Sequence, residues 1–221
     1  MRRRSILSAL AAFVGFACGQ SAHADVTTDD RLWVNTGIRT ELIQKLDLDF
    51  TQDFRHSTQG EFNRQIIPAI GLSYGLHSHF SVGTGARYNF EKTEEEAIQS
   101  IRFFGDFEAK SPDMGPVELG YRIRFQSENS AAYEESKNRL RNRFMLQFDT
   151  KSMAKPELFY EHFLDPAGEE NQKAKKYRVG GGVGLKLSQE HRLKFKFFQD
   201  KEIDGDGDKV RVIALGYRYN F

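Results

Sequence analysis

The sequence has a single cysteine and no excess of charge of either sign. Cys18 lies in the first 24 residues, and 32 Lys and Arg residues nearly balance 31 Asp and Glu residues. An exported chain without a second cysteine is not built on a disulfide framework. A nearly neutral chain also lacks the field that draws proteins to nucleic acid or to an anionic membrane surface. We therefore expect neither disulfide bonds nor a nucleic-acid partner.

Long apolar runs are also missing, with one short exception. The run Ile6–Ala17 follows three arginines and precedes Ala22-His23-Ala24, a small-x-small cleavage site. This is the pattern of a secretory signal peptide, and it is too short for a transmembrane helix. A lipid anchor on Cys18 is the minor alternative, because the residues just before it lack the expected leucine. We expect cleavage after Ala24, one domain over 25–221, and no helical membrane protein.

Apolar and polar residues alternate with a period of two through the rest of the chain, which predicts strands rather than helices. About eleven segments follow the pattern, at roughly 32–42, 46–54, 62–76, 80–90, 98–109, 117–125, 139–149, 156–164, 177–187, 192–200 and 209–221. Short connections alternate with longer polar ones. The sequence therefore predicts an all-β fold, an up-and-down antiparallel transmembrane β-barrel of about 10–12 strands.

Glycines indicate which face of these strands points inward. Most strand glycines share a face with the charged residues, among them Gly85, Gly180 and Gly182. A solvated surface has no need of missing side chains, whereas a narrow lumen must fit small residues opposite long arginines. We expect the polar face inside and the apolar face against lipid. Tyr and Trp favour membrane interfaces, and the candidates for such girdles are Trp33, Tyr74, Tyr88, Tyr121, Tyr160, Tyr177, Tyr217 and Tyr219.

The chain ends on a strand-like segment with an aromatic last residue. Tyr217, Tyr219 and Phe221 share one face of this segment. It resembles the terminal strand signal of outer-membrane proteins, which the barrel-assembly machinery reads. The expected location is the cell outer membrane, where the partners would be membrane lipids and lipopolysaccharide. Periplasmic chaperones and the barrel-assembly machinery would act during biogenesis, and the barrel would be a monomer.

Several strand motifs, taken in order, resemble a known family, the domain of unknown function 2490. The motifs are "LWVNTG", "LDLDFTQDFR", "LSYGL", "YRIRFQSE", "LRNRFMLQF", "PELFYEHF" and "KYRVGGGVGL". Each is loose by itself, and their order and spacing carry the resemblance. The family implies a Gram-negative outer-membrane barrel and brings no assigned reaction or ligand.

Many charged residues fall on the face expected to line the lumen. We expect a lumen-facing network of Asp49, Asp53, Arg55, Arg87, Arg102, Asp106, Glu118, Arg122, Arg124, Arg141, Arg143, Glu161 and Arg178. Such charges can form a paired network that fills the barrel and fixes its register. They can also form a basic stripe along a narrow channel for anions. The expected function is a narrow or plugged porin-like passive channel for small solutes or a structural envelope protein.

Two other functions leave weaker signals in the sequence. A lipid-modifying hydrolase would use histidine near the outer rim, where His56 and His162 are the candidates, but neither lies in a G-x-S-x-G motif. The segment Asp204–Lys209 suggests calcium, yet it lacks the Gly and Glu spacing of an EF-hand and suits a tight turn. We expect no enzyme activity, metal or other cofactor.

The strand count conflicts with a general rule. Bacterial single-chain barrels have even numbers of strands, and about eleven segments are visible here. The sequence offers two explanations: the segment at 32–42 belongs partly to the lumen, or one strand is missed or split.

Overall fold

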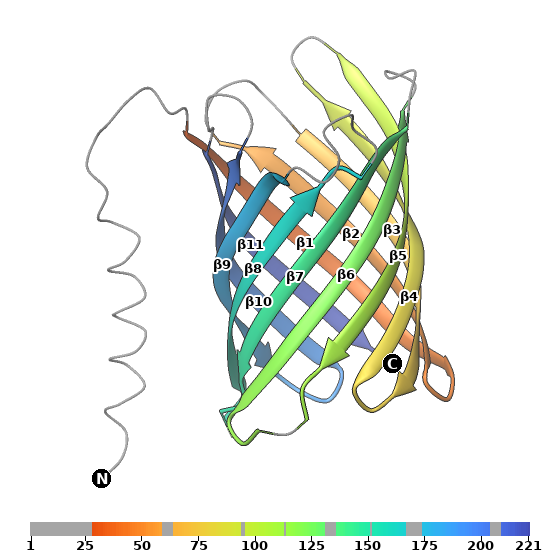
Figure 1. The fold of residues 1–221 in the computed structure, drawn as a ribbon, viewed down its shortest axis with the longest axis vertical. Coiled ribbons are helices and arrows are strands. Elements are labelled where there is room, and N and C mark those ends of the chain that lie inside the picture. Colours follow the sequence, from red (N-terminus) through yellow and green to blue (C-terminus); the bar gives the residue numbers. More distant parts are fainter. Residues whose placement is uncertain are drawn as a thin grey trace, which may run out of the picture.

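The computed structural model describes residues 28–58, 64–93, 96–112, 114–130, 136–150, 152–166, 174–203 and 209–221. These residues form a closed barrel of eleven strands (Figure 1). The predicted all-β barrel is therefore confirmed. The signal peptide with its cleavage site at Ala24 lies outside the described residues, as does Asp204–Asp208 of the suggested calcium loop. No helix in the described ranges is long and apolar enough to cross a membrane.

The strands follow one another around the barrel in sequence order. They are β1 (Thr28–Ile43), β2 (Leu46–Ser57), β3 (Arg64–His77), β4 (Phe80–Lys92), β5 (Ala97–Lys110), β6 (Val117–Ser130), β7 (Lys137–Phe148), β8 (Ala154–Leu164), β9 (Ala174–Lys186), β10 (His191–Glu202) and β11 (Lys209–Asn220). We call the end with connections 44–45, 78–79, 111–116, 149–153 and 187–190 the turn end. The opposite end, with connections 58–63, 93–96, 131–136, 165–173 and 203–208, is the loop end.

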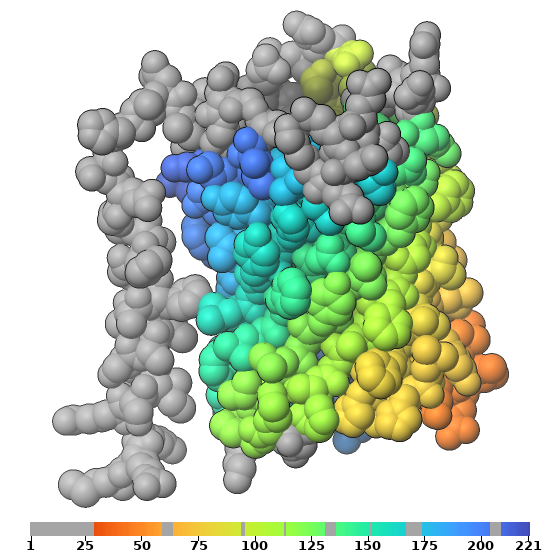
Figure 2. Space-filling view, viewed as in Figure 1, coloured from red at the N-terminus to blue at the C-terminus, as the bar shows by residue number. Residues whose placement is uncertain are grey.

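Because successive side chains of a strand point to opposite sides, the alternating residues form an outer and an inner face of the barrel. Large apolar side chains remain exposed on the outside around the barrel, for example Ile70 at 52%, Phe103 at 52% and Phe144 at 54%. Figure 2 shows the side chains of neighbouring strands forming a continuous outer wall on the face in view. A soluble monomer rarely exposes so extensive an apolar surface. The buried residues, including Glu161 and Val212, lie on the opposite face of the strands.

The barrel closes with an odd number of strands because β1 and β11 pair in parallel. Their register runs from Thr28 opposite Lys209 to Arg39 opposite Asn220, while every other neighbouring pair is antiparallel. The two explanations offered by the sequence are therefore wrong: β1 is a full wall strand, and the described residues form eleven strands that close without a further or divided one. An odd up-and-down sheet must join two strands of the same direction when it closes. Parallel pairing still satisfies the backbone groups, with slightly less stability per residue.

The glycines of the inner face occupy places where strands and side chains approach closely. A Cβ on Gly180 would lie 2.3 Å from Cβ of Phe198, and a Cβ on Gly85 would lie 2.5 Å from the ring of Phe104. By contrast, Gly105 faces outward, and a Cβ there would meet nothing within 4 Å. The inner glycines therefore make room for aromatic side chains in the lumen.

Candidate functional site

Contacts between strands that are not neighbours show where the lumen lies. Arg178 of β9 lies over the ring of Trp33 of β1 at 5.2 Å, although β10 and β11 separate the two strands in the wall. Arg122 of β6 likewise reaches Glu161 of β8 across β7, with Nη2 and Oε1 3.2 Å apart. Such side chains meet only inside the barrel. The inner face is therefore filled by charged and aromatic residues.

Glu161 is the centre of the most buried part of this network. Its side chain has no exposed surface. Its Oε1 accepts hydrogen bonds from Nη2 of Arg141 at 2.9 Å and from Nη2 of Arg122 at 3.2 Å. Nη1 of Arg178 lies 3.8 Å from Oε2. One carboxylate therefore compensates three arginines from three different strands.

Two other carboxylates on the same wall are shared in the same way. Glu157 of β8 forms ion pairs with Lys194 at 2.6 Å and Lys196 at 3.1 Å. Asp200 of β10 pairs with Arg178 at 2.6 Å and with Lys176 at 3.2 Å. The acids on this side of the lumen are fewer than the bases that surround them.

Pairs closer to one-to-one fasten the wall around β1 to β6. Arg39 binds Asp49 with Nε at 2.8 Å, Arg55 lies 3.3 Å from Asp53, and Arg102 pairs with Glu128 at 2.5 Å. Arg124 donates two hydrogen bonds to Asp106, and Asn35 donates one to Asp53. Most of these pairs join different strands and so help to fix the register.

Inward aromatic rings, in addition to the carboxylates, contact several arginines of the lumen. The guanidinium of Arg55 lies 3.9 Å from the centre of the Trp33 ring, and that of Arg178 lies 4.3 Å from Phe198. Three further contacts of this kind pair Arg124 with Phe104, Arg143 with Phe159 and Arg141 with Phe163, at 4.2, 4.2 and 4.8 Å. Arginine stacks favourably on aromatic faces, and more strongly where water is excluded. This contact lets the lumen keep a surplus of positive charge.

Two interior cavities are lined by described residues, one toward each end of the barrel. The cavity toward the turn end has a volume of about 730 Å³ and is lined by eleven Lys and Arg residues and three carboxylates. The cavity toward the loop end measures about 300 Å³ and is lined by nine Lys and Arg residues and three carboxylates. Both are therefore strongly positive.

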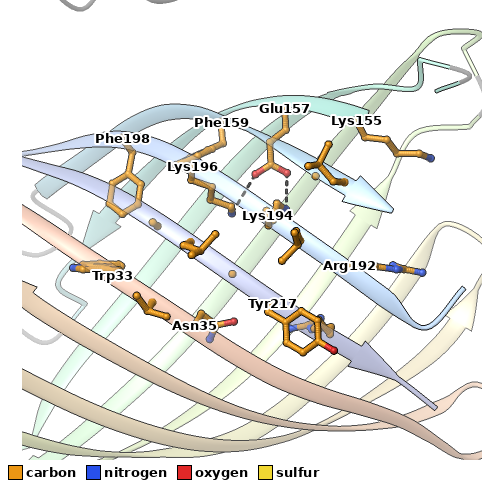
Figure 3. A pocket seen from close by; sticks show the side chains of 18 of the residues that line it. Trp33, Asn35, Lys155, Glu157, Phe159, Arg192, Lys194, Lys196, Phe198 and Tyr217 are labelled. Carbon is orange, nitrogen blue, oxygen red and sulfur yellow. Dashed lines mark ion pairs between the residues drawn. The ribbon is translucent and has the colours of Figure 1, made fainter. Parts of the chain in front are cut away.

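Four residues line both cavities and so mark the narrow place between them: Trp33, Arg55, Arg87 and Arg178. We call this group the constriction. Trp33 lies at one end of the turn-end cavity in the close view (Figure 3). Among the described residues, no carboxylate lies within ion-pair distance of Arg87. Any solute that passes between the cavities must therefore pass three guanidinium groups and an indole.

The structure places the thirteen charged residues expected in the lumen as follows. Twelve lie in the network, the constriction or both. Glu118 lines the turn-end cavity and pairs with Lys110 at 3.7 Å, with both side chains well exposed. Tyr217, Tyr219 and Phe221 lie together on the outside at the turn end, where Tyr217 contacts Nδ1 of His191 at 2.8 Å.

The assignment of Trp33 to an interfacial girdle is wrong. Its ring packs on Phe198 at 5.2 Å inside the barrel. The sequence does indicate the inward position, because Trp33 lies on the same face of its strand as Arg31, Asn35 and Arg39. A shared strand face with charged residues also identifies the inward aromatic residues that the expected network omits: Phe104, Phe159, Phe163 and Phe198. Lys194 and Lys196 were omitted as well and follow the same rule.

The histidines weighed for catalysis do not lie together. His56 is on β2 and His162 on β8, and at least five strand-to-strand steps separate these strands around the barrel. Both alternate with inward charged residues and so belong to the outer face. Within the described ranges, no group of three His, Cys, Asp or Glu side chains is arranged to hold a metal ion.

Comparison with known proteins gives one family and no individual relative. No curated protein and no solved structure matches the chain. The model of a family described as "Protein of unknown function (DUF2490)" matches residues 30–210, which is most of the chain and spans all or part of every strand. The chain therefore belongs to the DUF2490 family, as its strand motifs suggested.

Proposed function

We propose that this protein is an outer-membrane β-barrel whose lumen is a narrow conduit selective for small anions. The outer face supports the membrane location, because exposed Leu, Ile, Phe and Tyr side chains cover strands all around the barrel. The strands have 11 to 16 residues, and a tilted transmembrane strand needs about 9–11. The terminal Phe221, 74% exposed, lies on the outside where an assembly signal would be read. Lipids and lipopolysaccharide would surround the barrel, which would act as a monomer after delivery by periplasmic chaperones and the assembly machinery.

The constriction carries the proposal of anion selectivity. Rings of Arg and Lys favour anions in a pore because the field inside a low-dielectric wall is weakly screened. Here the three arginines of the constriction are held in place by Trp33, Phe198 and Phe104 at 3.9–5.6 Å. A cation would have to leave water and pass beside these three positive charges. An anion would meet Arg87, which has no carboxylate within ion-pair distance among the described residues.

The test is conductance in planar lipid bilayers with a salt gradient. We expect small discrete steps and a reversal potential on the anion side. Arg87→Glu should shift the reversal potential toward cations, because it reverses a charge of the constriction that no carboxylate of the described residues pairs at ion-pair distance. The matched control is Arg211→Glu, a charge reversal on the outer face at the loop end, which should leave selectivity unchanged.

A lumen that carries no current in the wild type and in Arg87→Ala would refute the conduit. The protein would then have a structural role in the envelope, with the charge network serving only to hold the barrel together. Equal permeability of Cl⁻ and K⁺ would also refute selectivity, even if steps were seen.

A further inference from the structure

The turn-end cavity contains a row of like charges that the ion-pair network leaves incompletely neutralised. Arg192 of β10 lies directly opposite Lys186 of β9 on one side and Arg218 of β11 on the other. Neighbouring strands are about 4.8 Å apart, so these side chains leave the wall within about 10 Å of one another. All three line the 730 Å³ cavity. Like charges directly opposite each other destabilise a sheet, so the row needs a counter-ion.

The opposed arginines of β6 and β7 have that counter-ion within the protein. Arg122 and Arg143 are also directly opposite each other, and Glu161 or Glu157 lies within 3.2 and 3.9 Å of them. In the turn-end row, Arg218 lies 3.6 Å from Asp49, a carboxylate that Arg39 already binds. The described residues provide no carboxylate within 4.0 Å of Lys186 or Arg192.

Lys194 extends the row toward the middle of the cavity. It follows Arg192 by two residues on the same face, which is about 7 Å along the strand. Although it binds Glu157, its side chain remains 44% exposed and can contact a second anion. Figure 3 shows Arg192 and Lys155 at one end of the cavity and Trp33 and Phe198 at the other, with Lys194 between.

We propose that Lys186, Arg192, Arg218 and Lys194 form a binding site for a small multivalent oxyanion, one that carries two or more phosphate or carboxylate groups. A row about 10 Å long with an arm of about 7 Å matches several linked anionic groups better than one. Guanidinium forks bind phosphate and carboxylate oxygens in pairs. The volume suits a small molecule. A lipid headgroup of the surrounding leaflet does not fit, because these side chains line the lumen and the lipid lies beyond the wall. The site deepens the proposed function, since it uses the same positive lumen and requires access at the turn end.

The test uses equilibrium binding, which does not depend on conductance. The full mature chain is folded in detergent and titrated with inorganic phosphate, tripolyphosphate and citrate. Binding is read by calorimetry and by the fluorescence of Trp33, the only tryptophan of the chain, which lines the same cavity. We expect tripolyphosphate to bind saturably and about tenfold or more tightly than phosphate, the gain expected from at least one further charge-assisted contact. The ratio of citrate to tripolyphosphate distinguishes carboxylate from phosphate chemistry.

Variants identify the residues. Arg192→Gln and Lys186→Gln should each weaken tripolyphosphate binding about tenfold, again as the loss of one charge-assisted contact. Lys201→Gln removes one charge from the same strand at a position that lines neither cavity, so its affinity should match the wild type. Circular dichroism verifies folding, and Lys186→Gln carries the test if Arg192→Gln does not fold.

The outcomes separate this site from the proposed conduit. Saturable binding that Arg192→Gln weakens, in a barrel without anion-selective current, keeps the site and removes the conduit. Anion-selective current without saturable tripolyphosphate binding overturns the site alone. Equal affinities for phosphate and tripolyphosphate, or an equal loss in Lys201→Gln, also overturn the site.

Discussion

Replacement of Glu161 by glutamine tests whether the charge network stabilises the barrel. The substitution keeps the shape of the side chain and removes its charge. Arg122, Arg141 and Arg178 would then lose a carboxylate that lies 2.9–3.8 Å from their guanidinium nitrogens. Glu161 has no exposed surface, so the charge would be lost from a position that bulk water does not reach.

The expected loss follows from this burial. Removing one partner of a buried ion pair costs about 3–5 kcal/mol, because a buried charge is left uncompensated. Three arginines share Glu161, so we expect at least about 3 kcal/mol. The matched control is Glu118→Gln near the turn end. Its pair with Lys110 spans 3.7 Å with 54% and 41% of the side chains exposed, so its loss should be below about 1 kcal/mol.

The assay is a urea titration of the protein in lipid vesicles, followed by circular dichroism from both the folded and the unfolded side. A second variant, Glu161→Gln with Arg141→Met, should recover part of the loss because it removes one uncompensated charge. A loss in Glu161→Gln no larger than that in Glu118→Gln would refute the reasoning. So would a double variant less stable than the single one, since then the contact and not the charge balance would matter.

Two further predictions concern packing and sidedness. Gly180→Ala should lower the free energy of unfolding by about 1–3 kcal/mol, the usual cost of overpacking, because its Cβ would lie 2.3 Å from Cβ of Phe198. Gly105→Ala should be neutral, because its Cβ meets nothing within 4 Å. Urea titration compares the two variants, and equal effects would contradict the close packing of the inner face. Lipids brominated on their acyl chains should leave the fluorescence of Trp33 nearly unchanged, because the ring lies in the lumen. The same lipids should quench the tryptophan fluorescence of a double variant, Trp33→Phe with Phe144→Trp, because position 144 lies on the outer face. Strong quenching of Trp33 would reverse the assignment of the two faces.

Period-two alternation was enough to predict the strands and their two faces. The eleven observed strands overlap the eleven expected segments, and several extend a few residues further toward the loop end, as Val117–Ser130 does. Alternation identifies the middle of a strand because every second side chain there points to the same face of the sheet. Strand ends are set by local pairing, and beyond Phe125 the residues of β6 are uniformly polar, so the pattern fades before the strand does.

For the inward aromatic residues, the preference of the residue type predicts the wrong face, whereas the position in the two-residue alternation predicts the right one. Tryptophan favours membrane interfaces and so predicts an interfacial position for Trp33, although its neighbours at two-residue spacing are the polar Arg31 and Asn35. Phe198 shows the same conflict, since it follows the outward Phe197 and shares its face with Lys196 and Asp200. The lumen accepts these rings because arginines cover them, a use of aromatic residues that depends on contacts between strands distant in sequence.

The parallel closure could not be predicted from local pattern, because it is a property of the strand count. Each strand alternates in the same way whether its neighbour is parallel or antiparallel. The choice is made only when the last strand meets the first. Here that meeting places Trp33 opposite Ala214 of β11 and opposite Arg55 of β2.

The register of this seam determines where the constriction lies. Ala214 has a small side chain, so the Trp33 indole can extend past it to Phe198 on β10 and to Arg178 on β9. A shift of β1 by one residue would turn Trp33 outward, because side chains alternate faces at each step. A shift by two toward Gly216 would move Trp33 away from Phe198, which lies opposite Val212. The pairing that closes the barrel therefore also positions the ring that holds Arg55 and Arg178 in the lumen, so barrel closure and the proposed selectivity depend on the same contact between the two ends of the sheet.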